Sequence, residues 1–155
     1  MRKSVDKVNS QGAAPADEVM DLVHTLMHQF RSLQYQVLRG GPHDITHMES
    51  KVMGFFARHP GATQSDLVQH SGRDKAQLAR LIKSLRERGL VLAEADEADR
   101  RNVRLSLSPE GQAVQRTLHQ QARRLGTQAV AGFSEDERRA LVELLRRVKS
   151  NLDVG

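Results

Sequence analysis

Apolar residues recur every three or four positions over most of the chain, which is the spacing of one face of an α-helix. Three of these stretches open with a capping box, in which a Ser or Thr hydroxyl and an acidic side chain three residues later satisfy free backbone N–H groups. The boxes are Thr46 with Glu49, Thr63 with Asp66, and Ser134 with Glu137. The pattern predicts helices over residues 17–38, 46–58, 63–70, 75–88, 108–132 and 134–152.

The helices at 63–70 and 75–88 are separated only by a tight turn. Ser71 and Gly72 form this turn, and Gly89 ends the second helix, whose apolar stripe is Leu78, Leu81, Ile82 and Leu85. Helix, tight turn and helix is the order of a helix-turn-helix unit, which places its second helix in the major groove of DNA.

A strand-like pattern follows the second of these helices. Between residues 103 and 107 apolar positions alternate with polar ones, which is the period of a half-buried strand, and residues 90–93 supply an antiparallel partner. The loop at 94–102 is acidic first and then basic, and Asp99 is placed to hold an adjacent arginine. The predicted fold is therefore mainly α with a small β-hairpin wing: a winged helix-turn-helix with N- and C-terminal dimerisation helices.

The positive charge of the chain is concentrated on the second helix of this unit. Residues 73–88 carry six lysines and arginines against two acidic residues, and the whole chain has a formal net charge of +5. We assign Arg88 to the exposed basic face, together with Lys75, Arg80, Lys83 and Arg86. A basic face between a helical turn and a hairpin favours a nucleic-acid partner.

Two side chains on this face are suited to reading bases. Glutamine can pair with adenine and arginine with guanine, and Gln77 and Arg80 lie three residues apart on one helix face. Phosphate contacts position a protein without specifying sequence, and we expect them from lysines and arginines nearby. With the helix start and the wing included, the candidate DNA contacts are Thr63, Gln64, Arg73, Lys75, Gln77, Arg80, Lys83, Arg100 and Arg101.

Three amphipathic helices lie outside the winged unit, which is more apolar helical surface than a monomer of 155 residues needs. The sequence therefore predicts a homodimer joined through both terminal regions. Its organisation is a disordered tail at 1–15, a dimerisation helix at 16–42, the DNA-binding region at 43–107 and dimerisation helices at 108–155. The candidate interface residues are Leu22, Leu26, Phe30, Leu141, Leu145 and Val148.

Several functional classes find no support in the sequence. There is no cysteine, no apolar signal peptide, and no apolar run of the roughly 18 residues that a membrane span requires. We also find no glycine-rich phosphate loop and no nucleophile elbow. The sequence predicts a cytoplasmic protein that is not an enzyme, has no membrane partner and needs no cofactor.

Histidine spacing leaves one alternative open. His24 and His28, and likewise His43 and His47, are four residues apart, which can place two imidazoles on one metal. Ordinary surface or partly buried histidines give the same spacing, and no thiolate is available. We therefore assign no metal site, and keep as the alternative a zinc-type metal-responsive regulator or a protein-interaction module of the same fold.

Three motifs resemble the MarR family of bacterial transcription regulators. They are DKAQLARLIKSLRERGL at 74–90, DEADRRNVRLSL at 96–107 and LSPEG at 107–111. The first is similar to the family's recognition helix, the second to its wing, and the third to the start of its long dimer helix. Ala76 and Ala79 depart from the Ser or Thr frequent in the family, which leaves more of the specificity to Gln77 and Arg80.

The resemblance implies a triangular homodimer that binds a pseudo-palindromic operator in double-stranded DNA. Recognition helices would lie in successive major grooves, and wings would reach the adjacent minor grooves. It further implies a repressor that a small ligand releases, with small aromatic acids a frequent class. The ligand pocket would lie between the winged unit and the dimer helices, near residues 43–56.

Overall fold

The computed structural model describes residues 15–153, so most of the predicted N-terminal tail, 1–15, lies outside the described residues. Six helices and one two-stranded antiparallel hairpin make up the described chain. This confirms the predicted fold class. The elements are α1 (Ala16–Gln36), α2 (His47–Arg58), α3 (Gln64–Ser71), α4 (Lys75–Glu87), β1 (Val91–Ala95), β2 (Val103–Leu107), α5 (Pro109–Ala129) and α6 (Glu135–Leu152).

Local side chains determine where the helices begin. All three predicted capping boxes are present, at the starts of α2, α3 and α6. Helix α5 starts with Pro109 after the Ser108 hydroxyl, which accepts the backbone N–H of Gly111. Each cap satisfies backbone donors that would otherwise have no partner at the end of the helix.

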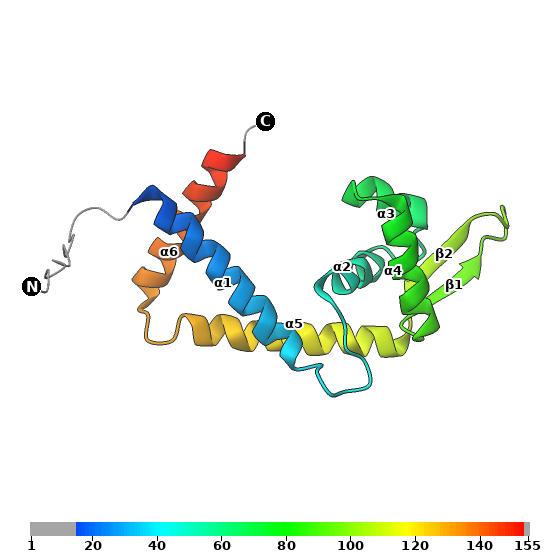
Figure 1. The fold of residues 1–155 in the computed structure, drawn as a ribbon, viewed down its shortest axis with the longest axis horizontal. Helices are drawn as coiled ribbons and strands as arrows, with labels where there is room; N and C mark the ends of the chain where they lie inside the picture. Colours follow the sequence, from blue (N-terminus) through cyan, green and yellow to red (C-terminus); the bar gives the residue numbers. More distant parts are fainter. Residues whose placement is uncertain (1–14, 154–155) are drawn as a thin grey trace, which may run out of the picture.

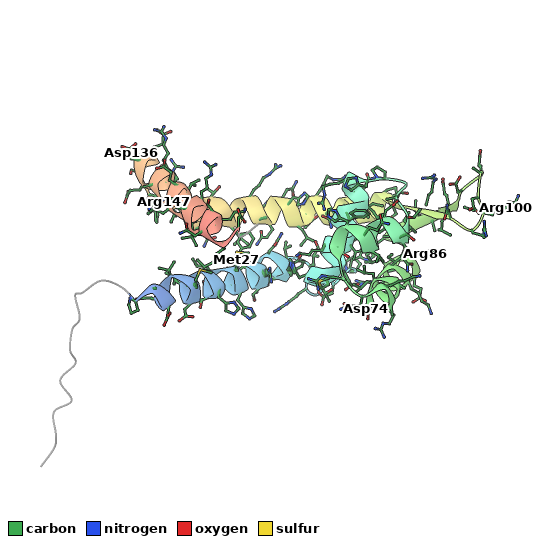
Figure 2. The ribbon with its side chains drawn as sticks, turned by 90° about the horizontal axis from the view of Figure 1, so that it is seen from above. Met27, Asp74, Arg86, Arg100, Asp136 and Arg147 are labelled. Carbon is green, nitrogen blue, oxygen red and sulfur yellow. The ribbon has the colours of Figure 1, made fainter. Side chains whose placement is uncertain are left out.

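The long helix α5 connects two ends of an elongated molecule (Figure 1). Helices α1 and α6 lie at one end, whereas α2, α3, α4 and the hairpin lie at the other. Figure 2 shows Asp136 and Arg147 far from Asp74, Arg86 and Arg100. Parts of the two regions that the sequence assigns to dimerisation therefore lie at the same end of the molecule, although they are far apart in the chain, and α1 contacts α5.

The hydrophobic core belongs to the winged end. Its fully buried side chains come from α2, α4, the α4–β1 junction and α5, and include Met53, Phe56, Leu78, Leu85, Leu90 and Leu118. By contrast, neither α1 nor α6 contains a buried residue. The described chain thus has a complete core at one end and uncovered helices at the other.

The hairpin is anchored at its base. Val91 pairs with Leu107 and Ala93 with Leu105, so that Val91, Leu105 and Leu107 point into the core. An isolated antiparallel β-bridge between Ala62 and Leu105 attaches the segment before α3 to strand β2. Strand β1 runs over Val91–Ala95 rather than the predicted 90–93, because Leu90 still donates its N–H to Leu85 at the end of the preceding turn.

The assignment of Arg88 to the exposed basic face was wrong. Its guanidinium turns toward α2 and pairs with the buried Glu49 carboxylate, with Nη1 and Oε2 2.6 Å apart. Arg88 is the residue that caps the C-terminal end of α4, where the helical repeat no longer determines the direction of its side chain. None of the helices within 15–153 is both long and apolar enough to cross a bilayer.

Candidate nucleic-acid interface

The turn between α3 and α4 is closed by glycine in a left-handed conformation. Gly72 has φ of 64° and donates its N–H to Val68, which ends α3. Residues other than glycine are disfavoured at this φ, because their Cβ atom clashes with the backbone. The Asp74 carboxylate then accepts the N–H of Ala76 and starts α4 immediately, so the two helices meet with almost no connecting loop.

Helix α4 separates its apolar and basic side chains. Leu78, Ile82 and Leu85 are buried in the core, and Leu81 is half-buried. The basic and amide side chains on the opposite face are exposed: Lys75, Gln77, Arg80, Lys83 and Arg86. The Lys83–Glu87 pair is solvent-exposed on both sides and separated by 3.9 Å, which contributes little to stability. These cations are therefore available to an anionic partner.

The acidic residues of the wing hold its loop together. Asp96 accepts the N–H of Ala98 at 3.0 Å and pairs with Arg104 at 2.9 Å. These hydrogen bonds, first of all the one from the Ala98 backbone, keep the pKa of Asp96 below its usual value. Asp99 accepts both the backbone N–H and the Nε of Arg101, which confirms the predicted pairing of Asp99 with an adjacent arginine. The carboxylates of Asp96 and Asp99 are thus used inside the loop.

Two arginines remain at the exposed tip of the wing. Arg100 lies at the outermost part of the hairpin (Figure 2), and the Arg101 side chain is 92% exposed. Asp99 orients Arg101 without covering it. The wing therefore presents cations on a loop whose shape is determined by the preceding carboxylates.

The start of α3, α4 and the wing meet in a small groove of about 220 Å³. Thr63 and Gln64 lie on one side of it, and Arg101 and Asn102 on the other. Thr63 uses its hydroxyl and its N–H in the capping box with Asp66. Arg86 also lines the groove, although sequence reasoning did not include it among the DNA contacts. The sequence did contain a signal for Arg86 as a DNA contact, because it lies on the same basic face of the helix as Lys83.

Arg73 lies apart from this groove. It is exposed in the turn before α4 and lines a larger cavity of about 550 Å³ between the winged unit and helices α1 and α5. Lys51 and Arg58 are further cations in its wall, and no aspartate or glutamate of the described residues, 15–153, lines it. The predicted contacts thus divide into an outer set on the start of α3, on α4 and on the wing, and Arg73 on the cavity side.

His47 lines the same cavity and has one buried polar atom without a partner among the described residues. Its Nδ1 is 3.1 Å from the Tyr35 hydroxyl, whereas its buried Nε2 has no hydrogen-bond partner in the described chain. Burial, followed by the charges of Arg31, Lys51 and Arg73, lowers the pKa of His47, so the ring is neutral at pH 7. When the Tyr35 hydroxyl donates to Nδ1, Nε2 carries the proton and is a donor that lacks an acceptor.

The other histidine pairs have separate surroundings. His24 and His28 stack on α1 with ring centroids 6.4 Å apart. His43 lies 3.3 Å from Glu110, whereas His47 contacts Tyr35. Within residues 15–153 no group of three or more His, Cys, Asp or Glu side chains is arranged to hold a metal ion.

The candidate interface residues are on the uncovered helices. Leu22 and Leu26 on α1, and Leu141 and Leu145 on α6, are exposed, and Phe30 and Val148 are half-buried. Leu26 is 54% exposed and Leu145 45% exposed. These values are high for leucines on amphipathic helices, and they leave a large apolar face at this end without a partner.

Known proteins with similar sequences are bacterial transcription regulators. Residues 43–102 match the model of the MarR family. The transcriptional regulator HosA of Escherichia coli is 29% identical over 132 residues, covering 83% of this chain and 98% of HosA.

Solved structures share the fold. The crystal structure of wild-type MarR from E. coli in its apo form is 25% identical, with a TM-score of 0.67 over 88% of this chain and 98% of that one. FabT of Streptococcus pneumoniae, solved in complex with DNA, has a TM-score of 0.77 over 90% of this chain and 98% of that one. At 18% identity this second likeness establishes the fold alone.

Proposed function

The chain belongs to the MarR family, and from this premise we propose that it is a homodimeric, sequence-specific repressor that a small ligand releases from DNA. The observation that carries the proposal is the exposed basic face of α4, which directly follows the Gly72 turn and lies beside the wing arginines. Gln77 and Arg80 are the proposed base-reading residues. Thr63, Gln64, Lys75, Lys83, Arg100 and Arg101 are proposed to contact phosphates or the minor groove, and Arg73 a flanking phosphate.

Dimerisation is supported by the uncovered end of the molecule. Helices α1 and α6 have apolar stripes but no buried residue in one copy, and a second copy can cover both. The proposed division keeps 16–42 and 108–155 as dimer regions and 43–107 as the DNA-binding region. A symmetric dimer would present two copies of α4, which suits a pseudo-palindromic operator.

DNA binding is tested by selecting bound sequences from random duplex DNA and then titrating salt. Affinity for the selected site should fall steeply with salt, because neutralised phosphates release counterions. Arg80→Ala should weaken the selected site more than random duplex by roughly 1–3 kcal/mol, since a bidentate arginine discriminates between bases. Arg101→Ala is the matched control: a backbone or minor-groove contact should weaken both duplexes nearly in parallel.

The same measurements can refute the proposal. A flat salt dependence without preference for duplex DNA would exclude it and favour a protein-interaction role. If Arg80→Ala left the ratio of the two affinities unchanged, α4 would not be oriented as proposed. Circular dichroism checks that both variants remain folded, which we expect because neither side chain is buried.

The ligand is proposed to be a small aromatic anion in the 550 Å³ cavity. Its volume is in the usual range for small-molecule sites. Among the residues that the structure describes, Lys51, Arg58 and Arg73 line the cavity and no carboxylate does.

Benzoate and benzyl alcohol provide a matched pair of probes, since they are similar in size but differ in charge. At a concentration about a hundredfold above its dissociation constant, a ligand stabilises the folded state by roughly 2.7 kcal/mol, or about 5–10 °C. We expect benzoate to produce such a shift and to weaken operator binding, and benzyl alcohol to do neither. Equal shifts from both would contradict an anion site.

A further inference from the structure

A partly buried ion pair joins α2 to the C-terminal end of α4. Glu49 Oε2 accepts from Arg88 Nη1 at 2.6 Å, and Arg88 Nη2 donates to the carbonyl oxygen of Asp44 at 2.5 Å. The Glu49 side chain is only 8% exposed. Its second oxygen accepts the backbone N–H of Thr46 at 3.1 Å. Both carboxylate oxygens and both terminal guanidinium nitrogens are therefore in use.

This link attaches the recognition helix to another element through a side chain. Within the part of the chain that the structure describes, Arg88 is the only residue from 74 to 88 whose side chain hydrogen-bonds to another element. The rest of α4 is held by Leu78, Ile82 and Leu85. Apolar packing is not directional, whereas a charge-assisted hydrogen bond is. Arg88 therefore adds a directional constraint on the rotation and axial position of α4.

Helix α2 connects this link to the cavity. His47, Lys51 and Arg58 lie on the face of α2 that lines the cavity. Glu49 and Phe56 lie on the face that is buried in the core. Because a helix moves as a rigid rod, a displacement of the cavity face also moves Glu49, and with it Arg88.

Small movements at Arg88 are amplified at the proposed reading residues. Gln77 and Arg80 precede Arg88 by eleven and eight residues, which is roughly 12–16 Å along a helix. A tilt of about 5° around Arg88 would therefore move their side chains by about 1 Å. Bidentate base recognition does not tolerate such a shift without loss of geometry.

We propose that Glu49 and Arg88 form a clamp that positions the recognition helix α4 and makes it move together with the cavity helix α2. Both are positioning residues, because neither is placed against DNA or in the cavity. The readout on DNA rests on the proposed function, whereas the clamp itself can be tested without DNA.

The first test measures the position of α4 relative to α2. The chain has no cysteine, so Ala57→Cys on α2 and Ala76→Cys on α4, both exposed alanines, can carry spin labels without background. Labelled protein is mixed with an excess of unlabelled protein, so that each pair reports on one copy. We expect a narrow distance distribution by pulsed electron resonance in the parent, and broader ones in Glu49→Gln and Arg88→Lys.

Glu87→Gln is the matched control, because it removes the same charge from the exposed end of α4 and breaks only the 3.9 Å surface pair. Its distance distribution should match that of the parent. Arg88→Lys keeps the positive charge but replaces the planar fork, whose two nitrogens reach Glu49 and Asp44 separately, with a single nitrogen on a flexible chain. This variant provides the test if Glu49→Gln does not fold. Distributions that superimpose for all variants would overturn the clamp.

The second test measures affinity for the selected site and for a scrambled duplex, well below the melting temperature and at one fixed salt. Glu49→Gln and Arg88→Lys should each lower the ratio of the two affinities about tenfold, and Glu87→Gln should leave it unchanged. A merely structural pair would lower the melting temperature without changing the ratio, and that result would overturn the proposal. If the parent protein selects no DNA, the proposed function fails, and the distance measurement still decides the clamp.

Discussion

Leu145→Asp is expected to convert the protein to a monomer and to abolish its selective binding to DNA. Leu145 lies on α6, is 45% exposed in one copy, and belongs to an apolar stripe that includes Leu141 and Val148. Burying one such side chain contributes roughly 1.5–3 kcal/mol, and a two-fold interface contains each residue twice. The loss of roughly 3–6 kcal/mol weakens the dimer at least a hundredfold, before any cost of burying aspartate.

The loss of DNA binding follows from the loss of the second recognition helix. A monomer can contact only one half-site, so affinity for the full operator should fall to that for an isolated half-site. Sedimentation velocity measures the mass, and fluorescence anisotropy measures binding to full and half sites. The core of the winged end is distant from α6, the helix that contains Leu145, so circular dichroism should show the helices preserved (Figure 1).

Ser150→Asp is the control for this variant, because it places the same acidic residue on α6 at an exposed polar position. It should remain dimeric and bind the full site. A Leu145→Asp protein that sedimented as a dimer would show that α6 is not at the interface. In that case the exposed face of α1, which includes Leu22 and Leu26, would be the next to test.

Helix starts and the helix-turn-helix order could be predicted because their determinants are local. A capping box involves residues three apart, and Gly72 is the residue that a left-handed turn requires, so the sequence alone contains both signals. The pairing of Asp99 with Arg101 was predictable for the same reason, since the two are neighbours in the loop.

Contacts between distant residues were not predictable. Glu49 and Arg88 are 39 residues apart, and the pattern of α4 gave no indication that its last basic residue turns inward. Asp96 and Arg104 belong to opposite sides of the wing, and only the register of the hairpin brings them to 2.9 Å. Likewise, the cavity combines residues of α1, α2, α5 and the turn before α4, so no single stretch of sequence could predict it.

Gly111 is a further residue whose role is visible only in the structure. The sequence placed it in the motif at the start of α5 without a physical reason. In the structure a Cβ atom at this position would lie 2.3 Å from the carbonyl oxygen of Leu90, far inside van der Waals contact. That carbonyl also accepts the N–H of Ser108 at 3.0 Å, so it cannot withdraw without breaking a hydrogen bond. Glycine therefore permits α5 to approach the junction between α4 and β1.

Gly111→Ala is expected to lower the free energy of unfolding by about 3 kcal/mol, which corresponds to roughly 10 °C in melting temperature. Ser108 reinforces the junction, because its hydroxyl donates to the Gly89 carbonyl at 2.6 Å and accepts the N–H of Gly111. Gly126→Ala is the matched control on the same helix. No atom lies within 4 Å of a Cβ at Gly126, so alanine there should raise stability by up to about 1 kcal/mol through its better helix propensity.

Gly111→Ala should also alter DNA recognition while the protein remains folded. Helix α5 joins the winged end to the dimer end, and Gly111 sets how closely its first turn packs on the winged unit (Figure 1). Displacing that turn changes the separation of the two α4 helices in a dimer, which must match half-sites about 34 Å apart. Binding to the full operator should therefore weaken more than binding to a half-site, when both are measured below the melting temperature. If Gly111→Ala and Gly126→Ala raised the melting temperature alike, the close approach at Leu90 would not determine how α5 is seated.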